Sequence, residues 1–459
     1  MSDTRVINRV LIANRGEIAV RIIQACRAMD MESVLACSII DKNSLAARMA
    51  TRIICIGPAA ASESYLNIST LITSALETGC DALHPGYGFL AESEDLAQAC
   101  LDHGIVFVGP TPDQILHMGN KLAARRLARK AGVPILPGSE HVRTYQEALD
   151  IADHIGYPLI LKAAAGGGGR GMKIVSKRDD MEHLFASASA EARTAFGDDT
   201  LYLERYIPNA RHIEVQVLGD HHSNLVHLGE RDCSLQRRHQ KVVEESPAPA
   251  ISNTIRSSIR EAALKLARGI HYRNAGTVEF VLDRDTNEFY FLEMNTRIQV
   301  EHPVSEVVTG IDIVQEQLRV ASGESLRFTQ DEVIFRGHAI ECRINAEIPA
   351  ENFRPCPGRI TLWQSPTGPN IRMDTHCETG YEVPIYYDSM LAKLIVYGRN
   401  REEAITRMQR ALEDCHIEGI NTTLPFLRFI LTHSEFMAGR VSTRLVEQMI
   451  QEMTTSKAL

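Results

Sequence analysis

The sequence lacks several patterns that would each fix a class of protein. Its ten cysteines are scattered and no two are spaced as Cys-x-x-Cys, so neither a zinc site nor a disulfide framework is indicated. No apolar run approaches the roughly 20 residues that a membrane-spanning helix needs. The first residues lead into a predicted strand and lack the features of a signal peptide. These absences predict a protein of the reducing cytoplasm that does not span a membrane.

An excess of positive charge is also missing. The 459 residues include 49 Lys and Arg against 58 Asp and Glu, a net charge of −9, which argues against general nucleic-acid binding. Local basic runs are therefore better interpreted as sites for small anions. With 44% hydrophobic and 23% charged residues the composition is that of a soluble globular protein. The chain is too long for one core, and about three domains are expected.

The N-terminal part predicts an α/β unit with a parallel sheet. Strand-like runs at 6–13, 33–40, 82–83 and 105–108 are separated by helix-like segments at 16–29 and 66–76. The turn after the first strand contains one glycine, Gly16, where the GxGxxG dinucleotide motif needs three, so NAD binding is disfavoured.

Two features near the end of this unit leave alternatives open. The glycine-rich turn at 84–89 follows a predicted strand, and it could line a ligand site or be a tight turn only. A helix is predicted for 113–130, bridging to the next unit. Its Lys121 could contact phosphate, although a solvent-facing lysine fits the local pattern better.

A second α/β unit begins near residue 133. A strand at 157–162 ends in Lys162, and five glycines follow between residues 166 and 171. Glycines without Cβ atoms allow successive backbone N–H groups to close over phosphate oxygens. No Gly-Lys-Ser/Thr leads into a helix, so this is not a Walker A loop. The run predicts a mobile hairpin lid that excludes water.

Two polar runs dominate the centre of the chain. Residues 231–241 are rich in basic groups, and residues 293–302 carry two carboxylates, each run following a strand-like segment. Neighbouring antiparallel strands could bring Glu279, Glu293 and Asn295 together as oxygen ligands of Mg²⁺. Carboxylates buried on apolar strands are costly unless they are paired or bound to metal. A metal–nucleotide complex that reacts with a small anion is the function these runs favour.

The remaining segments complete an α/β pattern. Residues 211–217 alternate as a strand with His212, Glu214 and Gln216 on one face. A strand at 335–345 places Glu341 and Arg343 on one face, and 401–413 is an amphipathic helix. The polar residues after Gln448 are expected to fray.

These motifs together resemble the biotin carboxylase family, the ATP-grasp subunit of acetyl-CoA carboxylase, over essentially the whole length. The matching stretches are 12–18 (Ile-Ala-Asn-Arg-Gly-Glu-Ile), 84–90 (His-Pro-Gly-Tyr-Gly-Phe-Leu), 166–172, 230–241, 293–303, 341–347 and 386–390. The resemblance implies a Rossmann-like N-terminal domain at 1–115 and an ATP-grasp domain at 116–330, whose glycine-rich lid subdomain covers about 133–206. A C-terminal α/β domain at 331–447 and a tail at 448–459 would follow.

The resemblance also implies a site for ATP with Mg²⁺ or Mn²⁺. The implied phosphate contacts are Lys121, Lys162, Gly166, Gly167, Gly168, Gly169, Gly171 and Met172. The implied contacts around adenosine and ribose are Glu204, Arg205, Ile207, His212, Gln236 and His239. The implied metal ligands are Glu279, Glu293 and Asn295.

Bicarbonate and biotin would be the other two substrates. The residues implied to bind bicarbonate are Lys241, Arg297, Gln299 and the backbone of Val300. Glu301 would be the base that deprotonates bicarbonate for attack on ATP, giving carboxyphosphate. Arg343 would stabilise the biotin enolate, and Tyr87 and Gly88 would lie in the biotin pocket.

The chain contains no Ala-Met-Lys-Met biotinylation motif. Biotin is therefore expected on a separate carrier protein, with carboxyl transfer left to another protein chain, and the family suggests a homodimer. Acetyl-CoA, another acyl-CoA or a 2-oxo acid could be the final acceptor, acetyl-CoA and fatty acid synthesis being the commonest context. One alternative is another ATP-grasp ligase that makes a different acyl phosphate. A second is a catalytically inactive homologue, and the intact set of polar residues argues against it.

Overall fold

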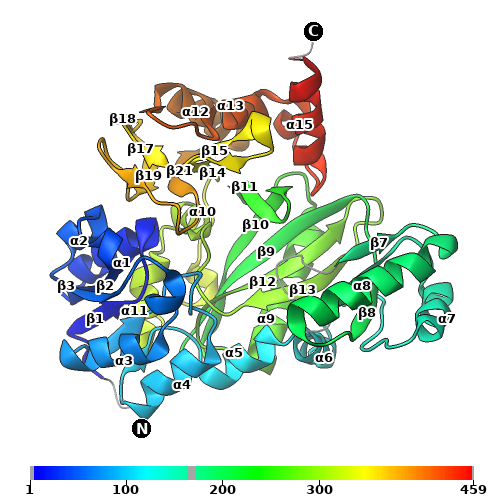
Figure 1. Ribbon diagram of the computed structural model, residues 1–459, viewed down its shortest axis with the longest axis horizontal. Helices are drawn as coiled ribbons and strands as arrows, with labels where there is room; N and C mark the ends of the chain where they lie inside the picture. The colour runs from blue at the N-terminus through cyan, green and yellow to red at the C-terminus, as the bar shows by residue number, and fades with distance from the viewer. Residues whose placement is uncertain (1–4, 164–171, 457–459) are drawn as a thin grey trace.

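The first sheet of the computed structural model, whose strands β1 to β3 are drawn in blue in Figure 1, is parallel throughout, as predicted. The structure describes residues 5–163 and 172–456. The strand order is β3-β2-β1-β4-β5. The strands are β1 (Arg9–Ile12), β2 (Glu32–Ser38), β3 (Arg52–Gly57), β4 (Ala82–His84) and β5 (Val106–Phe107).

Helices cover both faces of this sheet because the side chains of each strand alternate. Val10 and Ile12 of β1 pack with Ile18 of α1 (Gly16–Ala28) on one face. Leu11 packs on the other face with residues of α3 (Ile68–Glu77) and α4 (Glu94–Asp102), such as Leu71. The carboxyl end of β4 therefore opens into the turn at 84–89, next to α1.

The single helix predicted for 113–130 is wrong. The chain forms two helices, α5 (Pro112–Gly119) and α6 (Lys121–Lys130), separated at Asn120. Asn120 has an extended backbone (φ −86°, ψ 109°), and its side-chain oxygen accepts a hydrogen bond of 2.9 Å from the backbone N–H of Ala123. An asparagine that caps a helix in this way starts a new one, so Lys121 lies in the first turn of α6.

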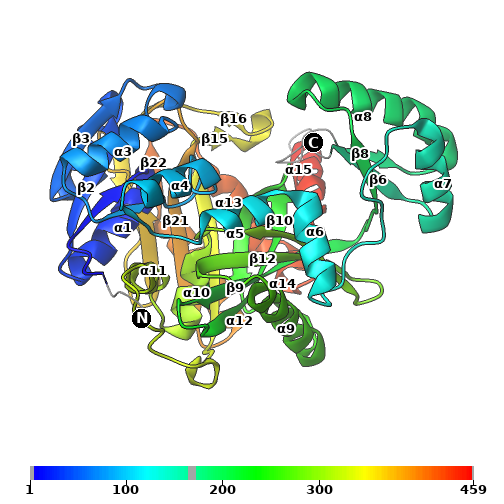
Figure 2. The same cartoon turned by 90° about the horizontal axis from the view of Figure 1, so that it is seen from below.

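A small antiparallel sheet of order β7-β6-β8 projects from the rest of the molecule at the right of Figure 2. Its strands are β6 (Leu159–Ala163), β7 (Lys173–Val175) and β8 (Leu201–Arg205). The helices α7 (Tyr145–Ile155) and α8 (Met181–Phe196) pack on it around Leu161 and Leu203. The predicted glycine lid, Gly166 to Gly171, lies outside the described residues.

The largest sheet has eight antiparallel strands in the order β13-β12-β9-β10-β11-β14-β21-β19. They are β9 (Ala210–Gly219), β10 (Leu225–Arg237), β11 (Gln240–Ser246), β12 (Asn274–Asp283), β13 (Phe289–Asn295), β14 (His338–Asn345), β19 (Ile371–Thr375) and β21 (Met390–Gly398). Pairing of β11 with β14 carries this sheet across residue 330, the boundary expected between two domains.

Helices pack on both faces of this sheet too. On the β12 side, α9 (Asn253–Gly269) contributes Ile259 to a core with Val215. On the β14 side, α10 (His302–Thr309) packs Val304 against Ile395. The opposite face of those strands is covered by α12 (Arg401–Asp414) and α13 (Leu424–Thr432).

Most of the remaining α-helices and β-strands are short. They are α2 (Leu45–Met49), α11 (Ile313–Ala321), α14 (Ser434–Met437), α15 (Leu445–Ser456), β15 (Glu347–Ile348), β16 (Arg354–Pro355), β17 (Gly358–Arg359), β18 (Leu362–Gln364), β20 (Glu382–Val383) and β22 (His416–Glu418). The expectation that the chain frays after Gln448 is wrong as far as Ser456, because α15 buries Val446 and Met449 in the core. Within the described ranges, no helix is long and apolar enough to cross a membrane.

Candidate active site

The basic run at 231–241 forms the end of β10, a two-residue turn and the start of β11. Both turn residues, Arg238 and His239, have positive φ (48° and 66°), as tight hairpins that follow the twist of the strands require. Gln236 and Lys241 pair across this turn. The hairpin thereby aims Lys241 back over the sheet, while His239 stays exposed at its tip.

The ammonium group of Lys241 lies among three carboxylates. Its Nζ is 2.6 Å from Oε2 of Glu214, 3.1 Å from Oε1 of Glu279 and 2.5 Å from Oε1 of Glu301. Burial alone would lower the pKa of Lys241, but these three anions raise it well above its ordinary value. Lys241 is therefore a fixed positive charge at the centre of the site.

Arg231 holds Glu214, one of these carboxylates, in place. Its guanidinium is fully buried and donates to Oε1 of Glu214 at 2.5 Å and to Oε1 of Gln299 at 2.7 Å. Further bonds reach the side chains of Gln216, Thr277 and Ser305. Arg231 thus joins β9, β10, β12 and α10 beneath the site.

An acidic row crosses three neighbouring strands. Glu279 of β12 lies opposite Glu293 of β13 on one side and opposite Glu214 of β9 on the other. Nδ2 of Asn295 donates to Oε1 of Glu279 at 2.9 Å. The structure therefore brings together the three residues predicted as metal ligands.

These oxygen atoms are of the kind that could hold a magnesium ion. Burial would raise the pKa of the Glu279 carboxyl, but the cations around it, above all Lys241, lower it. Burial and the neighbouring Glu279 instead raise the pKa of Glu293. Among the described residues, no cation lies within ion-pair distance of Glu293. A hard divalent cation would supply the missing positive charge.

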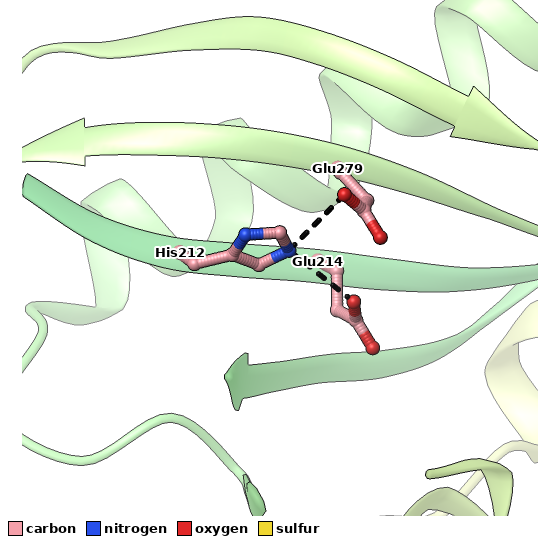
Figure 3. Close-up of side chains that lie close together, drawn as sticks. All are labelled: His212, Glu214 and Glu279. Atoms are coloured by element: carbon pink, nitrogen blue, oxygen red, sulfur yellow. Dashed lines mark ion pairs between the residues drawn. The ribbon is translucent and has the colours of Figure 1, made fainter. Parts of the chain in front are cut away.

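His212 stands beside the acidic row (Figure 3). Its Nε2 is 3.3 Å from Oε2 of Glu279 and 3.5 Å from Oε2 of Glu214. Burial would lower the pKa of this imidazole, but the facing carboxylates raise it to about 9. The residue predicted to contact adenosine or ribose is thus a cation that partners Glu279.

The segment that follows β13 is tied to the N-terminal part of the chain. Nε of Arg297 donates to Oε2 of Glu92 at 2.9 Å, and its Nη2 donates to Oδ1 of Asn295 at 2.9 Å. Nε2 of Gln299 donates to Oε1 of Glu279 at 2.8 Å. Side chains of the two polar runs, Lys241 and Gln299, therefore meet at Oε1 of Glu279.

Glu301 lies between two cations. One carboxylate oxygen contacts Lys241, and the other accepts a bond of 2.7 Å from Nη2 of Arg343. Nε of Arg343 also donates to Oε1 of Glu244 at 2.5 Å. Burial would raise the pKa of Glu301, but Lys241 and Arg343 lower it below its ordinary value. Glu301 is therefore ionised at neutral pH and can accept a proton. A small cavity beside Lys241 and Arg343 is lined by both of these side chains.

Some of the residues predicted to hold ATP lie on β6, β8 and α6. Nζ of Lys162 is 2.5 Å from Oε2 of Glu204, whose other oxygen pairs with Arg125 of α6. Lys121 begins the same helix. Of the other residues predicted to contact ATP, Gln236 donates to the backbone carbonyl of Cys233. Ile207 is buried, Arg205 is exposed, and Met172, just before β7, is half-buried.

The turn at 84–89 is held by Asn14, which donates to the backbone carbonyls of Pro85 and Tyr87 at 2.6 and 2.7 Å. The Tyr87 hydroxyl donates to Glu17 of α1. Gly88 has a φ of +71° and nothing lies within 4 Å of where its Cβ would be, so the turn is open on that side. Gly88 therefore leaves this edge of the turn accessible to a ligand.

Several charged residues of this region were not predicted as part of a site. Arg125, Arg231, Glu244 and Lys393 each carry a buried or half-buried ion pair. Lysine is almost never fully buried unless it is paired. A lone lysine inside the apolar run 390–398, at position 393, was therefore a signal that could have been used.

Three family models match successive parts of this chain. The family models described as "Biotin carboxylase, N-terminal domain", "Carbamoyl-phosphate synthase L chain, ATP binding domain" and "Biotin carboxylase C-terminal domain" match residues 6–115, 120–329 and 341–448.

Individual relatives are similar over nearly their full length. A protein named biotin carboxylase from Nostoc sp. is 52% identical over 443 residues, covering 96% of this chain and 99% of its own. A pyruvate carboxylase component from Methanothermobacter thermautotrophicus is 49% identical, covering 96% and 90%. Among solved structures, the biotin carboxylase domain dimer of Hydrogenobacter thermophilus 2-oxoglutarate carboxylase, in complex with MgADP, ADP and bicarbonate, superimposes with a TM-score of 0.92. It is 45% identical, covering 97% of this chain and 98% of that one.

Proposed function

Because this chain belongs to the biotin carboxylase family of ATP-dependent carboxylating ligases, we propose that it carboxylates biotin with bicarbonate. The observation that carries the proposal is Glu301, an ionised carboxylate held between Lys241 and Arg343. A general base beside fixed cations suits deprotonation of a small anion. The relative from Hydrogenobacter thermophilus, described in complex with bicarbonate and MgADP, supports the same choice of substrates.

Bicarbonate would enter the point where the two polar runs meet. Lys241, Arg297 and Gln299, with the backbone of Val300, would bind it. The contacts of Lys241 and Gln299 with the same oxygen, Oε1 of Glu279, support this choice. Glu301 takes the proton of bicarbonate, and an oxygen of the resulting anion attacks the γ-phosphorus of ATP. The bond to ADP breaks and carboxyphosphate forms. Since such an oxygen is a poor nucleophile, positioning and charge neutralisation supply most of the acceleration.

ATP would bind between the small sheet and the acidic row. Lys121, Lys162 and the glycine run at 166–171 would hold its phosphates, and Glu204, His212, Gln236 and His239 would lie towards adenosine and ribose. Glu279, Glu293 and Asn295 would hold Mg²⁺, which neutralises phosphate charge as the γ-phosphoryl group transfers. The raised pKa of Glu293 supports this assignment, because a neighbouring dication would favour its ionised form.

Biotin carboxylation would follow at the site where bicarbonate binds. Carboxyphosphate gives CO₂ and phosphate, and the phosphate removes the ureido N–H proton of biotin. Arg343 would stabilise the enolate with a preorganised charge, in the way an oxyanion hole does. Tyr87 and Gly88 would border the biotin ring. The position of Arg343, bonded to Glu301 and lining the cavity, supports this division of roles.

We place this reaction as the first half-reaction of an acetyl-CoA carboxylase, with biotin on a separate carrier and a separate carboxyltransferase. Relatives named for pyruvate carboxylase and 2-oxoglutarate carboxylase make a 2-oxo-acid carboxylase the second candidate. Ten free cysteines suit a reducing cytoplasm. The dimer described for the Hydrogenobacter thermophilus relative supports a homodimer.

An ATPase assay tests the function directly. Purified protein with MgATP should release ADP only when bicarbonate is present, and it should form carboxybiotin when free biotin is added. Activity with an amine or another carboxylate in place of bicarbonate would instead indicate a different ATP-grasp ligase. Absence of bicarbonate-dependent ADP release at any biotin concentration would overturn the proposal.

A further inference from the structure

Lys393 is a fully buried lysine in the centre of β21. Its side chain is 0% exposed, and its Nζ donates 2.8 Å to the backbone carbonyl of Val300 and lies 3.0 Å from Oε1 of Glu17. Glu17 is also buried and belongs to α1, far away in sequence. One ammonium group therefore joins the C-terminal part of the large sheet, the segment before α10 and the first helix of the chain.

The position of Lys393 in the sheet places it next to the segment proposed to bind bicarbonate. Lys393 and Arg343 are directly opposite on β21 and β14, so their side chains share one face. Arg343 bonds to the side chain of Glu301, and Lys393 bonds to the carbonyl of Val300, the preceding residue. Two adjacent cations thus hold two consecutive residues of the same segment.

Glu17 extends the connection towards the proposed biotin pocket. Its Oε1 receives both the ammonium of Lys393 and the hydroxyl of Tyr87. The other charged groups that face Lys393 are Asp374 of β19, with an oxygen at 3.8 Å, and Glu341 of β14. Among them, only Glu17 also contacts Tyr87 in the described part of the chain.

The energetics do not require this pair for stability. A buried ion pair gains little over well-packed apolar groups, because removing both charges from water is costly. The hydrogen bond to Val300, by contrast, fixes a backbone that leads directly into Glu301, the residue that begins α10 as its N-cap. The contribution that remains for this pair is to hold the backbone of Val300 in one orientation.

We propose that Lys393 and Glu17 form a positioning pair that orients the Val300–Glu301 backbone for bicarbonate and connects it to Tyr87. This inference rests on the proposed function, since it presumes that bicarbonate binds at this segment. Neither residue touches the reacting atoms. Their loss should therefore weaken the use of bicarbonate while leaving ATP binding, which involves other elements, nearly intact.

The test replaces both charges at once. Lys393→Met with Glu17→Gln removes the cation and its nearest anion together, so neither is left as an unpaired buried charge and the double variant should fold. Its Tm should fall, because Asp374 and Glu341 lose a facing cation. We expect KM for bicarbonate to rise about tenfold or more, the loss expected for one hydrogen bond to a charged group. KM for ATP should change less than about twofold. An unchanged KM for bicarbonate in a folded, active double variant would overturn the inference.

Arg401→Met is the matched control. Arg401 also forms a half-buried ion pair with a strand of the large sheet, with Nε 2.7 Å from Oε2 of Glu245, but it contacts neither Val300 nor Tyr87. It should lower Tm without changing KM for bicarbonate. An equal rise in KM for bicarbonate in this control would mean that any loss of stability has the same effect, and the positioning role would be rejected.

A double-mutant cycle tests the connection to Tyr87. Tyr87→Phe removes only the hydroxyl that bonds to Glu17, so KM for bicarbonate should rise in the wild-type background but not in the double variant. Equal effects in both backgrounds would overturn the connection. If the wild-type protein itself shows no bicarbonate-dependent ATP cleavage, the proposed function fails, which is a different result from an active enzyme that is indifferent to Lys393.

Discussion

Oε2 of Glu301 and Nη2 of Arg343 share a hydrogen bond of 2.7 Å, although Glu301 precedes α10 and Arg343 belongs to β14. The proposed base and the proposed enolate-stabilising group are thus direct neighbours. Arg343 is one of the cations that lower the pKa of Glu301. Removal of Glu301 should affect the deprotonation of bicarbonate, and removal of Arg343 should affect the later biotin step. Because the two side chains are bonded, each removal should also change the surroundings of the other side chain.

Glu301→Gln should suppress ATP cleavage and biotin carboxylation together. Without the base, bicarbonate keeps its proton and carboxyphosphate does not form, so both rates should fall about 100-fold or more. Phosphate release and carboxybiotin formation, measured side by side, check this. Substantial bicarbonate-dependent phosphate release from the variant would show that another group removes the proton.

Arg343→Ala should separate the two activities. A measurable share of bicarbonate-dependent ATP cleavage should remain under mildly alkaline conditions, while biotin carboxylation should fall about 100-fold or more, as when a preorganised donor is removed. Loss of a neighbouring cation raises the pKa of Glu301, so the acid limb of the ATP cleavage profile should move to higher pH. Equal loss of both activities would assign Arg343 to bicarbonate or ATP binding instead.

Glu293→Gln should make ATP turnover collapse at ordinary Mg²⁺ concentrations. The change keeps the shape of the side chain but removes a charged oxygen from the predicted metal site. Glu288→Gln is the control, because Glu288 is an exposed carboxylate just before the same strand, β13. Turnover of the Glu293 variant within about threefold of the wild type would exclude an essential ligand, since losing one should cost over about 1 kcal/mol of barrier.

His212→Gln should change how stability depends on pH in the absence of Mg²⁺ and ATP. Burial would lower the pKa of His212, but the carboxylate of Glu279 outweighs this and raises the pKa to about 9. The histidine therefore contributes stability that is fully present below its unfolded pKa of about 6.5 and is lost as pH rises through about 9. The gap in stability between wild type and variant should be about 1–3 kcal/mol at about pH 6 and should close by about pH 9.5.

Thermal unfolding with a chelator present, followed from about pH 6 to about pH 10, measures that gap. His416→Gln, which changes an exposed histidine of β22, is the control for removing a histidine elsewhere in the chain. A gap for His212→Gln that widens towards alkaline pH would contradict the assignment of a cationic imidazole.

Much of the fold could be predicted because its signals are local. Alternating strands and helices before residue 110 indicated the parallel sheet, and the apolar runs around Glu279 and Glu293 indicated neighbouring strands. The break at Asn120 was missed although Gly119 and Asn120 are poor residues for a helix interior, because the helix-favouring segments on both sides were treated as one. The side-chain bond from Ala123 to Asn120 shows where the second helix begins.

The site could be predicted only as far as sequence motifs extend. The partners of Lys241 come from two strands and a loop, and no spacing in the sequence indicates that Glu214 would bind both Lys241 and Arg231. Lys393 reaches Glu17 from the opposite end of the chain, a contact that depends on how the first helix packs on the last strands. Such long-range pairs are set by tertiary packing, which leaves no local pattern.

The continuity of the eight-stranded sheet bears on how this chain can be divided. β14 completes its hydrogen bonds with β11 on one side and β21 on the other, so a fragment that starts near residue 331 would present β14 as an open, apolar edge. Exposed edges of this kind promote aggregation. We expect truncation at that point to give insoluble protein, and backbone amides of β11 and β14 to exchange with deuterium as one cooperative unit. Separable fragments, if any exist, should be cut at the small projecting sheet instead.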